Sequence, residues 1–220
     1  PYDKDTVFDP SLLPPSEQIA AFFIETYQGR TAQMYPKLYL QDLYNFAREN
    51  GALICFDEIQ SGFYRMGKLY GYMTYGDYEP DIVCLGKGIT SSLPMSAVLS
   101  TKELIDVDAN LSSTHSGNAL CCAAGLANLN YLTSEKFQEE LSERVKVFED
   151  RSRRLEKYDS VSYVNVRGMV AAIIFKDSKE ADRVVEFCFN NGIFPVNTWS
   201  NSIKLGPPLT ITVEAINEAF

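Results

Sequence analysis

The sequence predicts an α/β fold with a doubly wound, mostly parallel sheet, followed by a smaller α+β region. Two short apolar runs, 52–56 and 82–85, are continuously hydrophobic, as strands buried on both faces of a sheet are. Strands and helices alternate along the first half of the chain, which is typical of βαβ units. The alternation stops after Thr133, and this change predicts the second region.

The first half of the chain supplies the strands of the predicted sheet. A helix is expected to begin at Pro36 and to end at Asn50 and Gly51, because the apolar residues between them recur at the helical period. These residues are Leu40, Leu43, Tyr44 and Ala47. The expected strands are 19–25, 52–56, 82–85 and 96–99, and a helix at 118–132 follows the polar stretch 112–117.

The second half has a different pattern. A long amphipathic helix is indicated by apolar residues at helical spacing, with charged residues on the opposite face: Phe137, Leu141, Val145 and Phe148. After it we expect strands at 161–166 and 170–175, a helix at 179–190, strands near Ile193 and Ile203, and a helix from Val213. A domain boundary is therefore expected near residue 134.

Composition excludes several classes of function. The 220 residues are 45% hydrophobic, enough to bury one large core or two smaller ones. A net charge of −9 argues against nucleic-acid binding, and no apolar run has the length of a membrane span. The five cysteines are an odd number without metal-ligand spacing, which indicates small buried thiols in a reducing, cytoplasmic environment.

Lys87 stands between two glycines directly after the apolar run 82–85. Lysine is most often a solvated surface residue, and that interpretation stays open for Lys87. The position favours another one, because open α/β sheets bind ligands at the carboxyl ends of their strands. Gly86 and Gly88 would let the backbone turn tightly at this edge. The sequence therefore predicts a ligand site that contains Lys87.

Asp57 and Gln60 follow the strand at 52–56. One interpretation of Asp57 is a loop carboxylate that caps a turn. The other is chemical, because an enzyme that uses pyridoxal phosphate needs a lysine to hold the cofactor as a Schiff base. It also needs an aspartate that keeps the pyridine nitrogen protonated, so that the ring acts as an electron sink. Lys87 and Asp57, at the ends of two strands, supply that pair.

Four segments carry a resemblance to a known family: FDEIQSGFYRMGKL, DIVCLGKGITSSLPMSAVL, SSTHSGNALCCAAGLANL and IKLGPPLTIT. In order and spacing they resemble the class III pyridoxal phosphate aminotransferases of fold type I, the group of ornithine, acetylornithine and 4-aminobutyrate aminotransferases. The resemblance implies that residues 1–134 are the C-terminal part of the large cofactor-binding domain and that 135–220 are the C-terminal small domain. Members are longer, so we expect that an amino-terminal half is missing.

The resemblance also assigns roles to individual residues. It implies that Lys87 forms the Schiff base and moves a proton between substrate and cofactor, and that Asp57 holds the ring nitrogen. Gln60 would bond the phenolic oxygen of the ring. Thr114, together with Ser113, would bind the phosphate of the neighbouring subunit's cofactor, because the family builds its sites across a dimer interface.

A simpler interpretation exists for the hydroxyl-rich segment before the helix at 118–132. Ser113, Thr114 and Ser116 would cap that helix, which is compatible with phosphate binding because a helix amino terminus attracts anions. His115, the only histidine, is expected to be a loop residue without a role in proton transfer, since Lys87 fills that role.

Two departures from the family concern the substrate. Lys204 stands where ornithine-type members have an arginine that grips the substrate carboxylate, and lysine lacks the planar two-pronged fork. Arg30 stands where those members have a glutamate that neutralises this arginine. We expect a substrate whose carboxylate is distant from the reacting amine and is held by Arg30, Lys204 or both, although an exposed loop arginine is the simpler interpretation of Arg30.

The resemblance implies transamination of an ω-amino acid such as 4-aminobutyrate or ornithine, with a 2-oxo acid as acceptor. The same family includes aminomutases, racemases and a decarboxylase, and a non-catalytic dimerising chain is the remaining alternative. We expect a cytoplasmic homodimer with shared active sites that binds small molecules and neither nucleic acid nor membrane.

Overall fold

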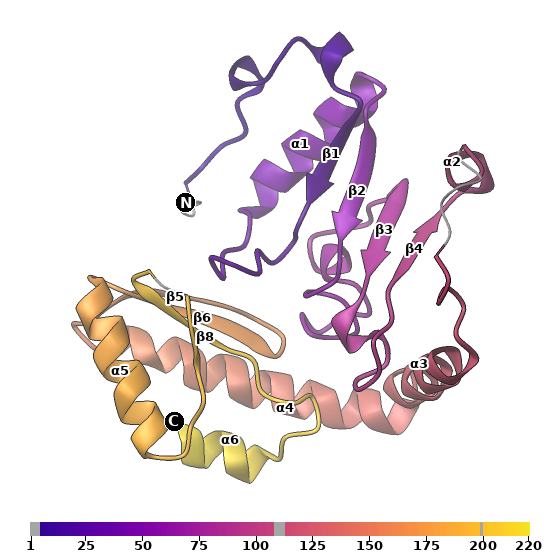
Figure 1. The fold of residues 1–220 in the computed structure, drawn as a ribbon. Helices are drawn as coiled ribbons and strands as arrows, with labels where there is room; N and C mark the ends of the chain where they lie inside the picture. Colours follow the sequence, from indigo (N-terminus) through magenta and orange to yellow (C-terminus); the bar gives the residue numbers. More distant parts are fainter. Residues whose placement is uncertain (1–4, 108–112, 199) are drawn as a thin grey trace.

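The computed structural model describes residues 5–107, 113–198 and 200–220, and these form two four-stranded sheets (Figure 1). The order in the first sheet is β1 (Ala21–Ile24), β2 (Leu53–Asp57), β3 (Ile82–Leu85) and β4 (Ala97–Ser100). The order in the second sheet is β5 (Val161–Arg167), β6 (Val170–Phe175), β8 (Ser202–Leu205) and β7 (Val196–Asn197). The predicted division near residue 134 coincides with Ser134, the N-cap of the helix between the sheets, and as a domain boundary it stays a prediction.

The first sheet is mostly parallel, as predicted. β1 pairs with β2 and β2 with β3 in parallel, whereas β4 is antiparallel to β3. The connection 86–96 explains the reversal, because it is shorter than the roughly dozen residues that a parallel crossover needs. One detail differs from the prediction: the described strands follow one another without the order reversal of a doubly wound sheet. The β2–β3 connection holds a 3-10 helix, Gly71–Thr74, where the sequence predicted no helix.

Six α-helices are described. They are α1 (Lys37–Glu49), α2 (Lys102–Ile105), α3 (Ala119–Leu132), α4 (Glu135–Arg153), α5 (Ser178–Asn190) and α6 (Val213–Ala219). α1 packs against β2 with its buried residues Leu40, Leu43 and Ala47, and it ends at Asn50. α4 runs along the second sheet and contacts α3 at one end (Figure 1).

Side-chain caps explain where four of these helices begin. In each case an oxygen of the N-cap side chain accepts backbone N–H groups of the first turn, which otherwise lack partners. The caps are Asn118 for α3, Ser134 for α4, Asp177 for α5 and Thr212 for α6.

The strand predicted near Ile193 begins later along the chain than expected. Ile193 lies in a loop, and β7 begins three residues later at Val196. The backbone N–H of Ile193 donates to Cys188 O at 2.9 Å, so it belongs to the turn that ends α5 and cannot join a sheet ladder. The strand predicted near Ile203 is confirmed as β8.

The core is continuous under both sheets, and β6 is buried along its whole length. The cysteines only partly follow the prediction, because Cys55 is fully buried while Cys122 is exposed. No helix in the described part of the chain is long and apolar enough to cross a membrane.

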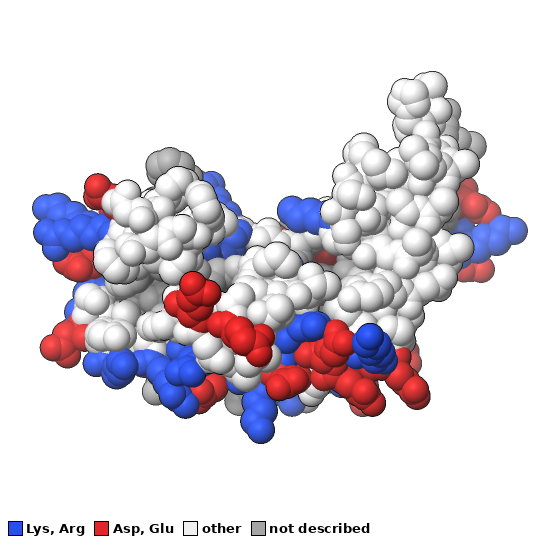
Figure 2. Space-filling view, turned by 90° about the horizontal axis from the view of Figure 1, so that it is seen from below, with Lys and Arg blue, Asp and Glu red and all other residues white. Residues whose placement is uncertain are grey.

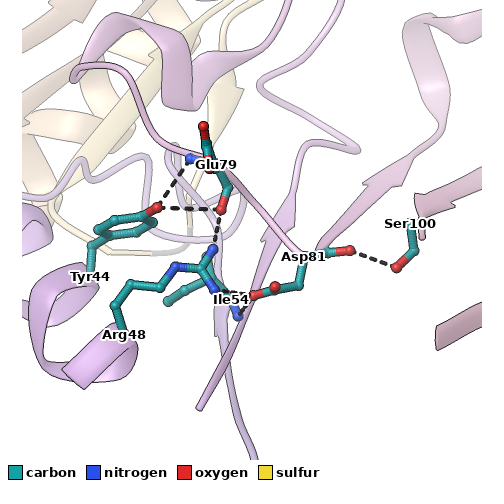
Figure 3. A network of polar contacts seen from close by, with 6 residues as sticks. All are labelled: Tyr44, Arg48, Ile54, Glu79, Asp81 and Ser100. Carbon is teal, nitrogen blue, oxygen red and sulfur yellow. Dashed lines mark hydrogen bonds and ion pairs between the residues drawn. The ribbon is translucent and has the colours of Figure 1, made fainter. Parts of the chain in front are cut away.

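A polar network holds the amino-terminal edge of the first sheet (Figure 3). Asp81 Oδ2 lies 2.7 Å from Arg48 Nη1 and accepts the backbone N–H of Ile54 at 2.7 Å. Arg48 also donates to the carbonyl of Glu79, and Ser100 Oγ donates to the carbonyl of Asp81 at 2.6 Å. This edge is therefore occupied by structural contacts, and the opposite, carboxyl edge carries the predicted site.

Candidate active site

Lys87 lies at the carboxyl end of β3, as predicted, and begins the short 3-10 helix Lys87–Ile89. Its φ of 41° is in the left-handed region, which costs a residue with a side chain about 1–3 kcal/mol and is typical of functional sites. Gly86 is buried, and a Cβ at this position would lie 3.3 Å from Ile59 Cγ2. The Lys87 side chain is exposed, and within the described residues no carboxylate lies within ion-pair distance of its ammonium group.

Asn128 on α3 holds the turn that carries Lys87. Its amide nitrogen donates to Gly88 O at 2.8 Å and to Ile89 O at 3.3 Å, and its amide oxygen accepts from Ser91 Oγ at 2.9 Å. Sequence reasoning missed this residue. The signal was available, because few polar side chains interrupt the apolar α3.

A cavity of about 650 Å³ opens beside Lys87 between the two sheets. Gln60 and Lys87 line it from the first sheet, and Lys204 lines it from β8. Arg65, from the β2–β3 connection, adds a third positive charge, and no described aspartate or glutamate lines this cavity. An excess of cations without a carboxylate favours an anionic ligand.

Lys204 reaches across from the second sheet to the first. Its Nζ donates to Gly29 O at 3.0 Å, and Gly29 N donates to Glu25 Oε2 at 2.9 Å. Burial lowers the pKa of Lys204, the nearby charge of Lys87 lowers it further, and Glu25 acts in the opposite direction. Glu25 is thus a negative group near Lys204 that the sequence interpretation did not include.

Asp57 lies at the carboxyl end of β2, beside Cys84 in the parallel register. It is half-buried rather than buried, and its Oδ1 accepts the backbone N–H of Ile59 at 3.0 Å. Asp57 lines a smaller cavity of about 290 Å³ together with Cys84 and Arg30, and not the larger cavity that holds Lys87. The two predicted groups therefore lie on adjacent strand ends and line two cavities, and a third cavity of about 340 Å³ adjoins both, since it shares Lys204 with the larger and Arg30 with the smaller.

Gln60 and Arg30 flank the loop that receives Lys204. A Cβ on Gly29 would lie 2.3 Å from Gln60 Oε1, so the end of the Gln60 side chain lies close against the backbone whose carbonyl Lys204 contacts. Arg30 is exposed, and it lines a further cavity of about 340 Å³ together with Lys204. The structure thus brings the two predicted carboxylate anchors to one cavity.

Ser113 and Thr114 are exposed at the approach to α3 and line none of the described cavities. The helix is capped by Asn118, whose Oδ1 accepts from Leu120 N and Cys121 N, so the expected capping by the serines and the threonine is wrong. Ser113 Oγ instead lies 2.9 Å from Ser116 Oγ. His115 is exposed in the same turn, whereas Ser112, the first residue of this motif, lies outside the described residues.

Glu58 is a fully buried carboxylate that sequence reasoning also missed. Its Oε1 accepts from Thr26 Oγ1 and Tyr72 N at 3.1 and 2.9 Å, and its Oε2 accepts from Ser61 Oγ and Gly71 N at 2.8 and 2.5 Å. Burial raises the pKa of Glu58 and these donors act against that rise. The carboxylate organises the long β2–β3 connection, and only the tertiary contacts reveal it.

Replacing Glu58 by glutamine is expected to lower the free energy of unfolding by about 2–4 kcal/mol, because the new NH₂ group would face donors instead of acceptors. Urea unfolding of the full-length protein measures this change. Glu143→Gln, at an exposed position on α4, is the matched control and should leave stability unchanged. An unaltered midpoint in Glu58→Gln would show that the charge does not organise the connection.

Comparison with known proteins agrees with this geometry. Residues 13–220 match the family Aminotransferase class-III, whose members depend on pyridoxal phosphate. An isoleucine 2-epimerase from Lentilactobacillus buchneri is 30% identical, covering 94% of this chain and 48% of that protein. An acetylornithine aminotransferase from Clostridium acetobutylicum is 31% identical, covering 93% of this chain and 54% of that protein.

Solved structures show the same fold. An ornithine aminotransferase from Toxoplasma gondii superimposes with a TM-score of 0.83 at 30% identity, covering 93% of this chain and 50% of that one. An S-selective transaminase from Arthrobacter sp. superimposes with a TM-score of 0.84 at 26% identity, with the same coverage. The chain spans about half the length of the curated relatives it matches. With its fold type I architecture and the family match along nearly its whole length, the chain belongs to the class III aminotransferases.

Proposed function

We propose that the protein to which this chain belongs transfers the amino group of an ω-amino acid, of the 4-aminobutyrate or ornithine type, to a 2-oxo acid. The observation that carries this proposal is the placement of Lys87, held in a left-handed turn at the mouth of a cavity lined by positive charges. An ammonium group without a carboxylate partner in the described structure is available for covalent chemistry, and the remaining cations suit substrates that carry carboxylates.

The residues present fit pyridoxal phosphate. Asp57 uses Oδ1 for the N–H of Ile59, and its Oδ2 makes no described hydrogen bond and can accept from a protonated ring nitrogen. Lys87 would hold the aldehyde carbon and carry the proton at the substrate carbon, and Gln60 would donate to the phenolic oxygen. The cofactor, when bound, supplies the electron sink for the carbanion. Holding Lys87 on a rigid turn orients its Nζ for that proton transfer.

A substrate panel tests the reaction. Full-length protein with pyridoxal phosphate is given ornithine, 4-aminobutyrate or isoleucine, each with and without 2-oxoglutarate or pyruvate. Transamination yields glutamate or alanine only when the acceptor is present. The relative named isoleucine 2-epimerase favours a second candidate, inversion at the amino-bearing carbon, which would appear without an acceptor. If neither transamination nor inversion is detected and no cofactor is bound to Lys87, the result would favour the remaining alternative, a non-catalytic dimerising chain.

For the substrate, we propose that Lys204 binds a carboxylate distant from the reacting amine and that Arg30 assists from the adjoining cavity. Lys204→Gln is expected to cost roughly 2–5 kcal/mol in kcat/KM for 4-aminobutyrate and ornithine and little for an uncharged amine. Arg30→Gln should cost less, because Arg30 is exposed. Equal losses on all three substrates would show that neither side chain reads the carboxylate.

This anchor also predicts a pH dependence. The pKa of Lys204 lies below its ordinary value of 10.5, so its charge is lost at a lower pH than for a free lysine. As the pH rises toward 10.5, Lys204 loses its charge and binds carboxylates more weakly, so KM for carboxylated donors should rise. The rise should be absent in Lys204→Gln.

We propose that the protein is a homodimer with shared active sites and a cytoplasmic location. α3 supports the dimer, because it carries no charged residue and exposes Leu120 and Leu126. Figure 2 shows a broad uncharged surface on the side where α3 lies, with the charged residues along the lower edge. Thr114 leads into this helix away from the cavities of its own chain, so it would serve a second copy's phosphate.

The dimer gives a direct prediction. Sedimentation velocity of the cofactor-loaded full-length protein should show one species of twice the monomer mass. Thr114→Val should keep that mass but bind pyridoxal phosphate about tenfold more weakly, since a charge-assisted hydrogen bond to phosphate is lost. An active, cofactor-loaded monomer would contradict the shared site.

A further inference from the structure

Arg65 joins the two sheets through three hydrogen bonds. Its Nη1 donates to Met169 O at 2.9 Å and to Pro207 O at 2.6 Å, and its own carbonyl accepts the N–H of Met169 at 2.9 Å. Met169 lies in the β5–β6 turn, and Pro207 follows β8 by two residues. One arginine of the β2–β3 connection therefore holds two separate segments of the second sheet.

The contact is close and rigid on both sides. Gly168 has a φ of 63°, and a Cβ there would lie 2.3 Å from the carbonyl carbon of Met66, so no other residue fits. On the opposite side, the carboxylate of Glu58 binds Ser61, before Arg65, and Gly71 and Tyr72, after it, and so ties together the part of the connection that carries Arg65. Arg65 is thus presented from a fixed loop to a fixed turn.

The partners of Arg65 are unusual for a partly buried guanidinium. Its burial lowers its pKa, and within the described residues it makes no ion pair, only bonds to carbonyls. A desolvated charge without a carboxylate is costly, so a hydrophobic side chain would serve a purely structural contact at lower cost. Unlike a hydrophobic side chain, the guanidinium makes hydrogen bonds of defined geometry, and those from Nη1 fix the positions of two carbonyl groups.

Those positions determine where Lys204 lies. Pro207 is three residues beyond Lys204, which lines the same cavity as Lys87 and whose ammonium donates to Gly29 O at 3.0 Å. We propose that Arg65 is a positioning residue that orients the 204–207 segment, so that the Lys204 ammonium is placed across the cavity from Lys87. This inference rests on the proposed carboxylate anchoring by Lys204, and it assigns a role that Arg65 exerts through Pro207.

Arg65→Met and the conservative Arg65→Lys test the proposal in the full-length, cofactor-loaded protein. Arg65→Met should raise KM for 4-aminobutyrate, and the dissociation constant of the unreactive dicarboxylate glutarate, by about 10- to 100-fold, because a displacement of about 1 Å is enough to lose an anchor. KM for an uncharged amine should change less than about threefold. Arg65→Lys should lie between, since an ammonium group can donate to both carbonyls but lacks the fixed planar geometry of the guanidinium.

Arg167→Met is the matched control. Arg167 belongs to the same β5–β6 hairpin and also contacts the first half of the chain, through Thr74 Oγ1 at 3.1 Å and over the ring of Tyr75, but it does not line the cavity. Its loss should lower thermal stability without changing glutarate affinity. Equal effects of Arg65→Met and Arg167→Met on glutarate binding would reduce Arg65 to a structural contact and overturn the proposal.

The double variant Arg65→Met with Lys204→Gln separates positioning from direct binding. If Arg65 acts through Lys204, the double variant should lose no more glutarate affinity than Lys204→Gln alone. Additive losses would show that Arg65 binds the anion independently, and the positioning role would be rejected. Borohydride fixation of the cofactor to Lys87 in the wild-type protein is the reference: if it fails, the proposed function fails, whereas fixation with unchanged glutarate affinity in Arg65→Met overturns this inference alone.

Discussion

Lys87→Ala is expected to reduce turnover by about 10⁴-fold or more, because it removes both the covalent attachment point and the group that moves the proton. The full-length wild-type protein should be yellow with its cofactor bound, and borohydride should fix the cofactor to the peptide that contains Lys87. The variant should bind pyridoxal phosphate only reversibly. Peptide mass spectrometry after reduction measures the difference.

Lys136→Ala is the control for this variant, since Lys136 is an exposed lysine on α4 without a described contact. It should keep normal turnover and full fixation at Lys87. A reducible adduct that persists at another lysine in Lys87→Ala would reject the assignment. The positive φ at Lys87 adds a structural point, because alanine bears the same backbone cost and the comparison isolates the side chain.

Asp57→Asn is expected to slow the half-reaction by roughly 10³-fold, about 4 kcal/mol of transition-state stabilisation. The amide keeps an oxygen for the N–H of Ile59, so the local fold should survive. It lacks the negative charge that keeps a proton on the ring nitrogen, and the electron sink is weakened. Single-turnover absorbance measurements with a saturating amino donor report this step directly.

Asp81→Asn is the control for Asp57→Asn. Asp81 belongs to the polar network at the opposite, amino-terminal edge of the same sheet (Figure 3). It pairs with Arg48 at 2.7 Å and accepts the N–H of Ile54, and it does not line the cavities that contain Lys87 and Asp57. We expect Asp81→Asn to lose about 1–2 kcal/mol of stability and to keep its turnover. Near-normal turnover in Asp57→Asn would reject the proposed role of Asp57.

The local sequence determined which strand ends carry the reactive groups. The apolar runs became β2, which is buried at its centre, and β3, whose residues alternate between half-buried and buried, and Asp57 and Lys87 lie where the polypeptide leaves the sheet. In parallel strands these ends lie on one edge, so placing the two residues near each other required no knowledge of distant contacts. The helix periods likewise located α1 and α4, since amphipathic spacing is a local property.

Tertiary structure alone decided the rest. Glu58 and Arg65 look like ordinary loop charges in the sequence, and their burial arises from partners far along the chain, such as Tyr72 and Pro207. Ile193 has the apolar character of a strand, but its N–H is already used by the end of α5. The same holds for Lys204, whose charge environment is set by Gly29, Glu25 and Lys87. Burial and electrostatic fields depend on which segments contact one another in the folded protein, and a local sequence pattern does not specify those long-range contacts.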